Sequence, residues 1–218
     1  MSNAASPGLH VPEDEDEIEQ LKERWRLRIR TARAHRSARH REEDARALAE
    51  VVVAIPAVDA ARCVSLYAAR PGEPSTGPLL ELLEQRGVRV LLPVLGTGLQ
   101  RDWADYAGAD DLLERAPGRP PEPSGPSLGA QALAEADVVL VPALAVDTEG
   151  NRLGQGGGWY DRALAHARPD AAVIALTYAD EVHDADVEPI PRAPHDRRVD
   201  GVATPTGTRW FVRPTAAA

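Results

Sequence analysis

The stretch CVSLYAARPGEPSTGPLLELLEQRGVRVLLP, residues 63–93, begins and ends with short apolar runs at residues 63–67 and 88–93. Between the two runs, Pro71 and Gly72 indicate a turn, and residues 76–85 have the pattern of a helix. A strand, a helix and a second strand in this order are typical of a parallel sheet, because parallel strands need a long crossover connection. This stretch therefore predicts an α/β fold.

The rest of the chain continues the alternation. Further apolar runs predict strands at residues 137–142, 172–176 and 201–203. Helical patterns lie at residues 18–37, 43–53, 131–134 and 159–167. We expect a three-layer Rossmann-like fold with a mostly parallel central sheet flanked by helices in a single domain.

Two regions carry weaker signals. The tract at residues 96–126 is rich in glycine and proline, which predicts a weak hairpin near residues 99–106, an irregular excursion after it, and a mere spacer at the PPEP stretch, residues 120–123. At the ends of the chain we expect a disordered tag and acidic tail over residues 1–17, a domain over 18–213 and a flexible tail over 214–218.

Composition narrows the classes of function. An apolar content of 43% over 218 residues argues against a disordered chain, and the formal net charge of −9 argues against a protein that coats nucleic acid. No apolar run is long enough to span a membrane. The single cysteine, Cys63, cannot form an internal disulfide and falls within a strand pattern, as a core residue would. We expect a cytoplasmic protein, a monomer with a dimer as the alternative, that binds neither nucleic acid nor membrane.

The charge is distributed unevenly. Residues 22–46 hold ten basic and four acidic residues, a net of +6, which leaves −15 for the remainder of the chain. In the first predicted helix an apolar stripe lies beside a basic face, which consists of Lys22, Arg26, Arg30 and Arg33. This face is either solvated or a clamp on a polyanion such as ATP, because cations one turn apart can reach successive phosphates.

The segment VPALAVDTEGNRLGQGGGWYDR, residues 141–162, joins a predicted strand to a predicted helix. Its glycines allow positive φ values and close approach of a ligand, and free N–H groups there favour an anion such as phosphate. A flexible turn would require the same glycines, and the spacing differs from the Walker and dinucleotide-binding loops. Asp161, on the first helical turn, either holds Mg²⁺ or interacts with the helix dipole.

These residues carry a resemblance to a known family. The string GQGGGWYDR, residues 154–162, preceded by VPALAVD, resembles the signature of the 5-formyltetrahydrofolate cyclo-ligases, also called 5,10-methenyltetrahydrofolate synthetases. Other segments match in order, so that the similarity runs from Lys22 to Thr204: Lys22-x-x-x-Arg26, PGEPST at 71–76, Glu122-Pro123, and PHDRRVD at 194–200 with Thr204. The chain departs from the family pattern at two positions of this string. Trp159 stands where the family commonly has Tyr, and Gln155 stands where it commonly has Tyr or Arg. Most of residues 96–126 also match the family poorly.

The resemblance implies a reaction. Family members use ATP and Mg²⁺ to convert 5-formyltetrahydrofolate into 5,10-methenyltetrahydrofolate, with release of ADP and phosphate. Phosphorylation of the formyl oxygen turns a poor leaving group into a good one, and N10 then attacks the formyl carbon. The protein contributes mainly positioning and charge neutralisation.

The resemblance also implies roles for residues of this chain. Those implied for ATP are Lys22, Arg26, Arg152, Leu153, Gly154, Gln155, Gly156, Gly157, Gly158, Trp159 and Tyr160. Those implied for the folate are Ala68, Glu73, Gly156, Gly157, Gly158, Trp159 and Tyr160, with Tyr67 beside Ala68. Glu73, Tyr160 and Arg152 would serve catalysis, and Asp161 and Asp196 would hold Mg²⁺. His195 either acts directly or caps a turn.

Other functions stay open from the sequence. The departures at Gln155 and Trp159 leave room for a paralogue that binds a nucleotide or phosphorylated ligand without cyclo-ligase activity. The basic helix would also suit a module that binds RNA or polyphosphate, although the charge of −15 outside it argues against this. A sugar-phosphate isomerase or a CoA transferase would suit the architecture, but a fold alone implies no chemistry.

Overall fold

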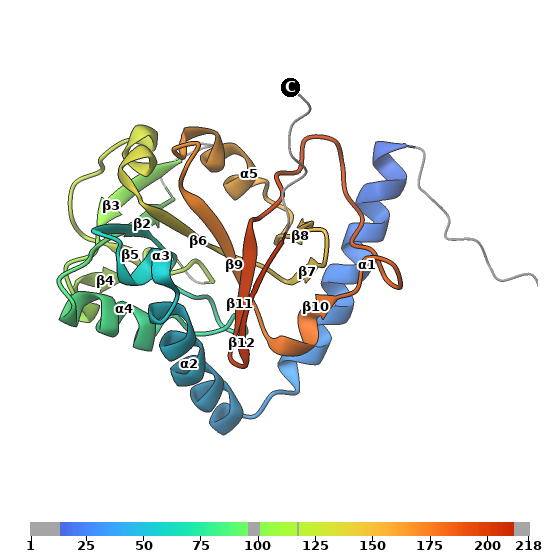
Figure 1. The fold of residues 1–218 in the computed structure, drawn as a ribbon, viewed down its shortest axis with the longest axis horizontal. Coiled ribbons are helices and arrows are strands. Elements are labelled where there is room, and N and C mark those ends of the chain that lie inside the picture. The colour runs from blue at the N-terminus through green and yellow to red at the C-terminus, as the bar shows by residue number, and fades with distance from the viewer. Residues whose placement is uncertain (1–13, 96–100, 117, 212–218) are drawn as a thin grey trace, which may run out of the picture.

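The computed structural model describes residues 14–95, 101–116 and 118–211. A seven-stranded sheet runs through its centre in the order β12-β11-β9-β6-β1-β2-β3 (Figure 1). The strands are β1 (Cys63–Ser65), β2 (Arg89–Val94), β3 (Asp102–Asp105), β6 (Val138–Pro142), β9 (Ala172–Leu176), β11 (Gly201–Thr204) and β12 (Gly207–Trp210). The five central strands are parallel, whereas β3 and β12 pair antiparallel at the two edges. The predicted α/β fold with a mostly parallel sheet is confirmed.

Helices cover both faces of this sheet. The helices are α1 (Glu15–Ala34), α2 (Ala38–Val53), α3 (Pro56–Asp59), α4 (Gly77–Gln85) and α5 (Trp159–Ala163). Apolar side chains of α2, α3 and α4 pack on one face, against inward residues such as Val64 and Leu140. The other face is covered by α5 and by the 3-10 segments Ala130–Glu135 and Leu164–His166, which pack against Val139 and Val173. Alternate residues of the five central strands therefore serve two cores, as buried parallel strands require. Cys63 is buried in β1, as predicted.

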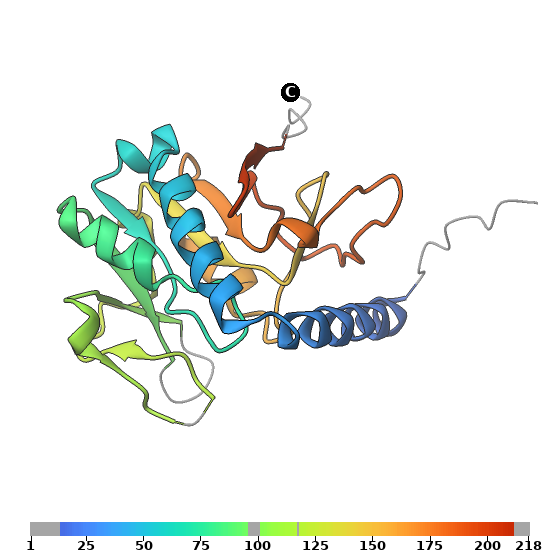
Figure 2. The same cartoon turned by 90° about the horizontal axis from the view of Figure 1, so that it is seen from below.

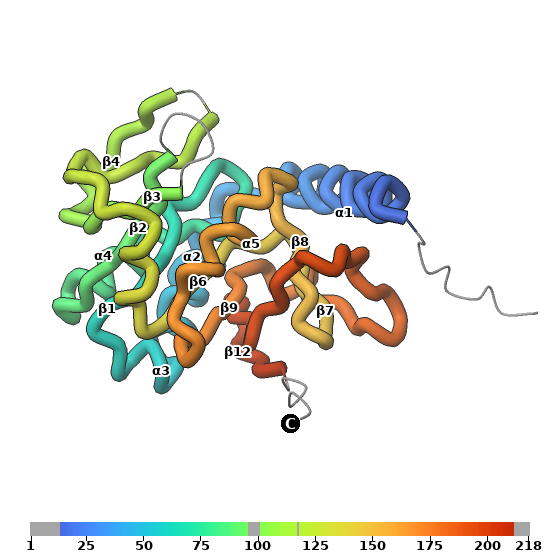
Figure 3. The backbone as a smooth tube through the Cα atoms, turned by 90° about the horizontal axis from the view of Figure 1, so that it is seen from above, coloured from blue at the N-terminus to red at the C-terminus, as the bar shows by residue number. Residues whose placement is uncertain are grey.

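Two small sheets flank the central one. β10 (Val182–His183), β7 (Ala145–Asp147) and β8 (Arg152–Leu153) form one, and β4 (Leu112–Leu113) and β5 (Glu122–Pro123) form the other. Helix α1 lies beside β7 and β8, and its N-terminal part extends away from the central sheet (Figures 2 and 3). Its apolar contacts with this part of the fold come from Ile29, which packs in a small cluster with Leu144 and Leu153, and from Trp25, which packs against that cluster.

Helix α1 begins at Glu15, earlier than predicted. Asp14 caps it, because its side chain accepts a hydrogen bond from the Glu17 amide at 2.7 Å, and the acidic first turn suits the positive end of the helix dipole. The predicted boundary between tail and domain at residue 17 therefore falls inside a helix. Residues 1–13 of the predicted N-terminal tail, and all of the C-terminal tail predicted over residues 214–218, lie outside the described residues.

Other expectations need correction. Helix α2 begins at Ala38 instead of residue 43, because Ser37 caps it with its hydroxyl. The α-helix predicted to residue 167 ends at Ala163 and continues as a 3-10 turn. The expected spacer is wrong for Glu122 and Pro123, which are buried in a strand. The strand near residue 103 pairs with β2, and residues 96–100 of the predicted hairpin lie outside the description. Within the described chain, no helix is long and apolar enough to cross a membrane.

Candidate active site

A cavity of about 750 Å³ opens at the carboxyl ends of β1, β2 and β6. The chain leaves β1 towards β2 on one side, and β6 lies on the other side, so the cavity sits where the strand order reverses. Ligands of open α/β sheets bind at such points. Every site residue that the resemblance implied lines this cavity: Lys22, Arg26, Ala68, Glu73, Arg152, Leu153, Gly154, Gln155, Gly156, Gly157, Gly158, Trp159, Tyr160, Asp161 and Asp196.

Residues 154–158, called here the glycine loop, form one wall. Gly156 and Gly158 have φ values of +101° and +55°, in the region that favours glycine. A Cβ at Gly156 would lie 3.2 Å from the Arg26 guanidinium carbon, so a side chain there would press on that cation. Glycine is therefore required at Gly156 and Gly158 for the backbone conformation, and at Gly156 also for the close approach of Arg26.

Two cations of α1 face the cavity and are buried. The ammonium group of Lys22 donates to Asp196 Oδ2 at 2.5 Å. Arg26 donates to the Gly154 carbonyl at 3.0 Å and to Glu19 and Glu23 at 2.6 Å each. The solvated-face interpretation is wrong for these residues, because both lie 6% exposed or less, where a charge needs a partner.

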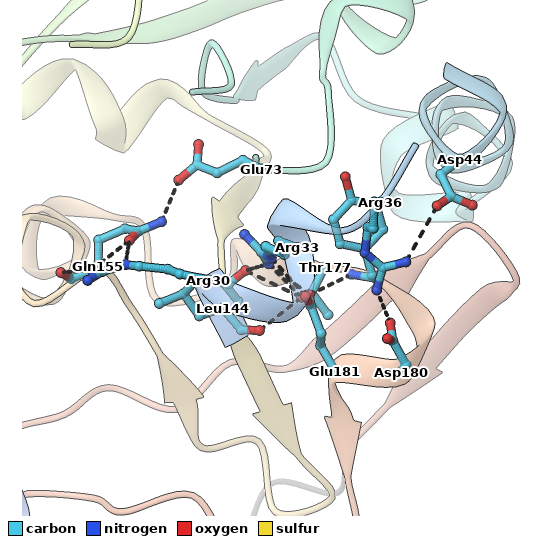
Figure 4. A network of polar contacts seen from close by, with 12 residues as sticks. Arg30, Arg33, Arg36, Asp44, Glu73, Leu144, Gln155, Thr177, Asp180 and Glu181 are labelled. Atoms are coloured by element: carbon cyan, nitrogen blue, oxygen red, sulfur yellow. Dashed lines mark hydrogen bonds and ion pairs between the residues drawn. The ribbon is translucent and has the colours of Figure 1, made fainter. Parts of the chain in front are cut away.

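Helix α1 is anchored to the sheet through Arg33, a contact that the sequence did not indicate (Figure 4). Its Nε and Nη2 donate to the two carboxylate oxygens of Glu181 at 2.7 Å each, and Nη2 also donates to the Ala143 carbonyl at 2.7 Å. Thr177 donates to the same carboxylate at 2.5 Å. This buried network fixes the position of the helix that carries Lys22 and Arg26.

The two candidate metal ligands are each paired with a cation. Asp161 Oδ1 accepts from Arg152 Nη2 at 3.0 Å, while Asp196 Oδ2 accepts from Lys22 and from the Ala193 amide. Burial disfavours the charged form of Asp196, but these hydrogen bonds outweigh it and lower its pKa below the ordinary value. Among described residues, Asp161 Oδ2 and Asp196 Oδ1 have no hydrogen-bond donor, although His195 Nε2 lies 3.9 Å from Asp196 Oδ1, so each carboxylate has one oxygen that a cation can approach.

These carboxylates fit Mg²⁺ and do not form a complete site by themselves. Mg²⁺ prefers oxygen ligands, keeps several waters, and is commonly held by one or two carboxylates together with substrate phosphates. Over the described part of the chain, no group of three or more His, Cys, Asp or Glu side chains is placed to hold a metal ion. A divalent cation here would need further oxygen ligands from water or from a phosphorylated ligand.

Buried polar atoms without partners surround the cavity. The Tyr67 and Tyr160 hydroxyls, the Trp159 indole nitrogen and the Arg152 Nε have no hydrogen-bond partner among the described residues. Burial, together with the nearby Glu73 charge, raises the pKa of both phenols, so they stay protonated and are donors. Unpaired buried donors lining a cavity are the groups that a ligand with acceptor oxygens or nitrogens would satisfy.

Glu73 lies on the opposite wall, after the turn at Gly72, and is 8% exposed. Its Oε2 accepts from the Arg70 amide at 2.9 Å and its Oε1 from Gln155 Nε2 at 3.0 Å. Thr76, from the same motif, donates to the Tyr67 carbonyl at 2.7 Å and holds the turn. The PGEPST motif thus presents one carboxylate to the cavity.

Some motif residues have structural positions. Asp147 is fully buried and accepts hydrogen bonds from the Glu149, Asn151 and Ile190 amides and from the Asn151 side chain. Glu122 is also buried and accepts from the Leu95 amide, at the end of β2. The His195 side chain is 70% exposed at the cavity, with its Nε2 3.9 Å from Asp196.

A model of the 5-formyltetrahydrofolate cyclo-ligase family matches residues 18–205. The chain belongs to this family. A 5-formyltetrahydrofolate cyclo-ligase of Mycolicibacterium smegmatis is 43% identical over 149 residues, 66% of this chain and 74% of that protein. The enzyme of that name from Escherichia coli is 30% identical over 181 residues, 82% and 97% of the two chains.

Solved structures of the family share the fold. A 5,10-methenyltetrahydrofolate synthetase from Aquifex aeolicus superimposes with a TM-score of 0.74 at 24% identity, over 91% of this chain and 96% of that one. The Mycoplasma pneumoniae synthetase gives a TM-score of 0.66 at 17% identity, over 84% and 98%. The resemblance drawn from the motifs is confirmed, and the chain is an enzyme of the cyclo-ligase family.

The cavity also contains arginines that the sequence did not single out as site residues. Arg70, Arg101 and Arg162 line it, and Arg162 donates to the Gly157 carbonyl at 2.6 Å. The motif string contains Arg162, so its position there was a usable signal. Arg70 lies next to the Pro71-Gly72 turn, and its closeness to Glu73 could have indicated it.

Proposed function

We propose that this protein uses ATP and Mg²⁺ to convert 5-formyltetrahydrofolate into 5,10-methenyltetrahydrofolate, with release of ADP and phosphate. One observation carries the proposal: the glycine loop with its cations faces the Glu73 turn across one cavity. The two segments are far apart in the sequence, since Gln155 and Glu73 are separated by 82 positions. Family membership supports cyclo-ligase activity. A cavity of about 750 Å³ is within the range of ligand sites.

The glycine loop and three cations would bind the nucleotide. Lys22, Arg26 and Arg152 now neutralise carboxylates, and the phosphates of ATP would take over as their partners. Amides of the glycine loop would donate to phosphate oxygens. When bound, Mg²⁺ supplies charge neutralisation at the phosphates, and Asp161 and Asp196 are the residues that would hold it.

The reaction then follows from the chemistry of an amide-like formyl group. The formyl oxygen attacks the γ-phosphorus as the bond from that phosphorus to ADP breaks. N10 attacks the formyl carbon, loses its proton, and expels the phosphate with the formyl oxygen. Charge develops on phosphate oxygens in both steps, so the buried cations and the protonated Tyr160 hydroxyl would stabilise it by hydrogen bonding.

Glu73 would orient the folate. A buried carboxylate only accepts hydrogen bonds when ionised, which suits the N–H groups of a pterin. Trp159 and Tyr160 would offer aromatic surface, since their ring centroids lie 4.8 Å apart and both line the cavity. A cytoplasmic location and a monomeric state stay predictions from the sequence.

The test is an assay of the purified chain with 5-formyltetrahydrofolate and Mg·ATP, read by the near-ultraviolet absorbance of the methenyl product. We expect product only when ATP and Mg²⁺ are both present. A variant separates the two substrates: Glu73→Ala should weaken folate binding at least tenfold, or about 1.4 kcal/mol. Its affinity for ATP, measured without folate, should be unchanged. Nucleotide binding by the wild type without product would favour the inactive paralogue.

A further inference from the structure

Gln155 joins three segments that meet at the cavity (Figure 4). Its side-chain Nε2 donates to Glu73 Oε1 at 3.0 Å, and its Oε1 accepts from Arg30 Nη2 at 3.0 Å. The same Arg30 nitrogen donates to the Gln155 backbone carbonyl at 3.1 Å. Because the other four residues of the glycine loop are glycines, Gln155 has the loop's one side chain.

The orientation of the Glu73 carboxylate depends on this amide. The Oε2 atom of Glu73 accepts a hydrogen bond from the Arg70 backbone amide within the same turn. Among described residues, the donor to Oε1 is Gln155, so the second hydrogen bond comes from the opposite wall of the cavity. A movement of the glycine loop would therefore change how Glu73 is held.

We propose that Gln155 is a positioning residue that orients Glu73 and links it to the glycine loop, so that nucleotide and folate bind cooperatively. The inference rests on the proposed function, which places the nucleotide at the loop and the folate at Glu73. A nucleotide that orders the loop also fixes Gln155, and the folate then meets a Glu73 that is already oriented. The coupling is reciprocal, so each ligand increases the affinity for the other, by about 5- to 150-fold on the scale usual for such coupling.

Two substitutions separate the two hydrogen bonds of the Gln155 side chain. Gln155→Glu keeps the length of the side chain and an acceptor for Arg30, but it removes the donor to Glu73 and brings two carboxylates together. Arg30→Met does the reverse, because it leaves the amide beside Glu73 and removes the Arg30 hydrogen bonds to Gln155, while the Arg26 bond from α1 to Gly154 stays. Matched controls are Gln131→Glu and Arg24→Met, whose residues are exposed and lie outside the cavity lining.

The pH dependence of Gln155→Glu gives a readout that a merely structural role would not move. Two neighbouring carboxylates resist being ionised together, so one takes up a proton as the pH falls and can again donate a hydrogen bond. Among described residues, the other charged or titratable groups that face this pair are Arg30 beside Gln155 and, near Glu73, Arg33, Arg70, Tyr67 and Tyr160. The arginines stay charged and the phenols stay protonated, so the variant-to-wild-type ratio at each pH isolates the carboxyl pair, with His195 common to both proteins.

The experiment is calorimetry of the full chain with 5-formyltetrahydrofolate and a magnesium complex of a non-hydrolysable ATP analogue, each with and without the other. We expect wild type and both controls to show the coupling. Gln155→Glu should lose it and bind folate about tenfold more weakly near pH 8, with recovery towards about pH 5.5. Arg30→Met should lose coupling while its affinity for folate alone, and the pH dependence of that affinity, match wild type.

The inference is overturned if Gln155→Glu shows the same coupling as the wild type. It is also overturned if this variant has a normal melting temperature but its lost coupling and folate affinity do not recover at low pH. Absence of coupling in the wild type overturns it as well. A wild type that binds both ligands cooperatively but forms no methenyl product contradicts the proposed reaction and leaves the role of Gln155 supported. If the wild type binds no folate, the proposed function and the inference fall together.

Discussion

The Lys22 ammonium and the Asp196 carboxylate are 174 positions apart in the sequence, and their Nζ and Oδ2 atoms lie 2.5 Å apart at the cavity. The pair joins helix α1 to the loop that precedes β11. In the proposed mechanism Lys22 binds phosphate and Asp196 holds Mg²⁺, so Mg·ATP would supply new partners of opposite charge for both. The free protein thus keeps Lys22 buried and Asp196 partly buried without leaving either charge unpaired.

Replacing Lys22 tests the nucleotide clamp. Lys22→Ala removes a buried cation that faces the cavity, so we expect the KM for ATP to rise at least about tenfold, corresponding to about 1.4 kcal/mol, with little change in the KM for folate. Steady-state kinetics with each substrate varied in turn measures this. Arg24→Ala, an exposed change on the same helix, is the control. A defect confined to the folate side would reject the clamp.

The same ion pair predicts a pH dependence of stability. The pKa of Asp196 is lowered in the folded protein, so its contribution is complete above its ordinary pKa of about 3.9 and is lost as the pH falls through the lower folded value. Asp196→Asn should reduce the free energy of unfolding by about 1–3 kcal/mol at neutral pH, and the difference from wild type should shrink below about pH 4. Urea unfolding at several pH values measures it. A difference that grows on acidification would contradict this assignment.

Asp161→Asn tests the metal assignment. In the wild type, Arg152 Nη2 donates to Asp161 Oδ1 at 3.0 Å. Asparagine keeps an oxygen that can accept this hydrogen bond, so the fold and the melting temperature should be preserved. Loss of the carboxylate charge should nearly abolish ATP-dependent cyclisation at any Mg²⁺ concentration. Turnover across a magnesium titration measures the effect. Unchanged turnover at saturating Mg²⁺ would show that Asp161 does not hold the ion.

The buried Arg33–Glu181 pair predicts a large effect on stability. Arg33→Met leaves the Glu181 carboxylate buried, at 4% exposure, without its cation, so we expect a loss of about 3–5 kcal/mol in the free energy of unfolding. The control Arg39→Ala breaks the exposed pair with Glu43 and should cost about 0.5 kcal/mol or less. Denaturant titration compares them. Similar losses in the two variants would mean that Arg33 does not anchor α1.

The central sheet was predictable because its signal is local. β1, β2, β6 and β9 are apolar runs, each of which can be recognised from a few consecutive residues. The strands of the small sheet β10-β7-β8 have only two or three residues each. They are strands because they pair with segments far away in the sequence, as Val146 does with Val182. The α1 start at Glu15 was missed because an acidic run has the same composition in a tail and in a first helical turn.

The candidate site was predictable wherever a motif marked it. The motifs placed Lys22, Glu73 and the glycine loop, and the structure brings them to one cavity. Their roles stay predictions. Nothing local to Arg33 indicates Glu181, 148 residues away, as its partner. The contact between Gln155 and Glu73 was missed for the same reason, since each residue alone has an ordinary sequence context.

In the proposed reaction, ATP activates the formyl oxygen of the substrate. The most direct measurement uses 5-formyltetrahydrofolate with a heavy-oxygen label in the formyl group, followed by mass spectrometry of the phosphate released during turnover with Mg·ATP. The mechanism predicts that the label appears in inorganic phosphate, one labelled oxygen for each methenyl product formed. Label found in water, with unlabelled phosphate, would contradict it.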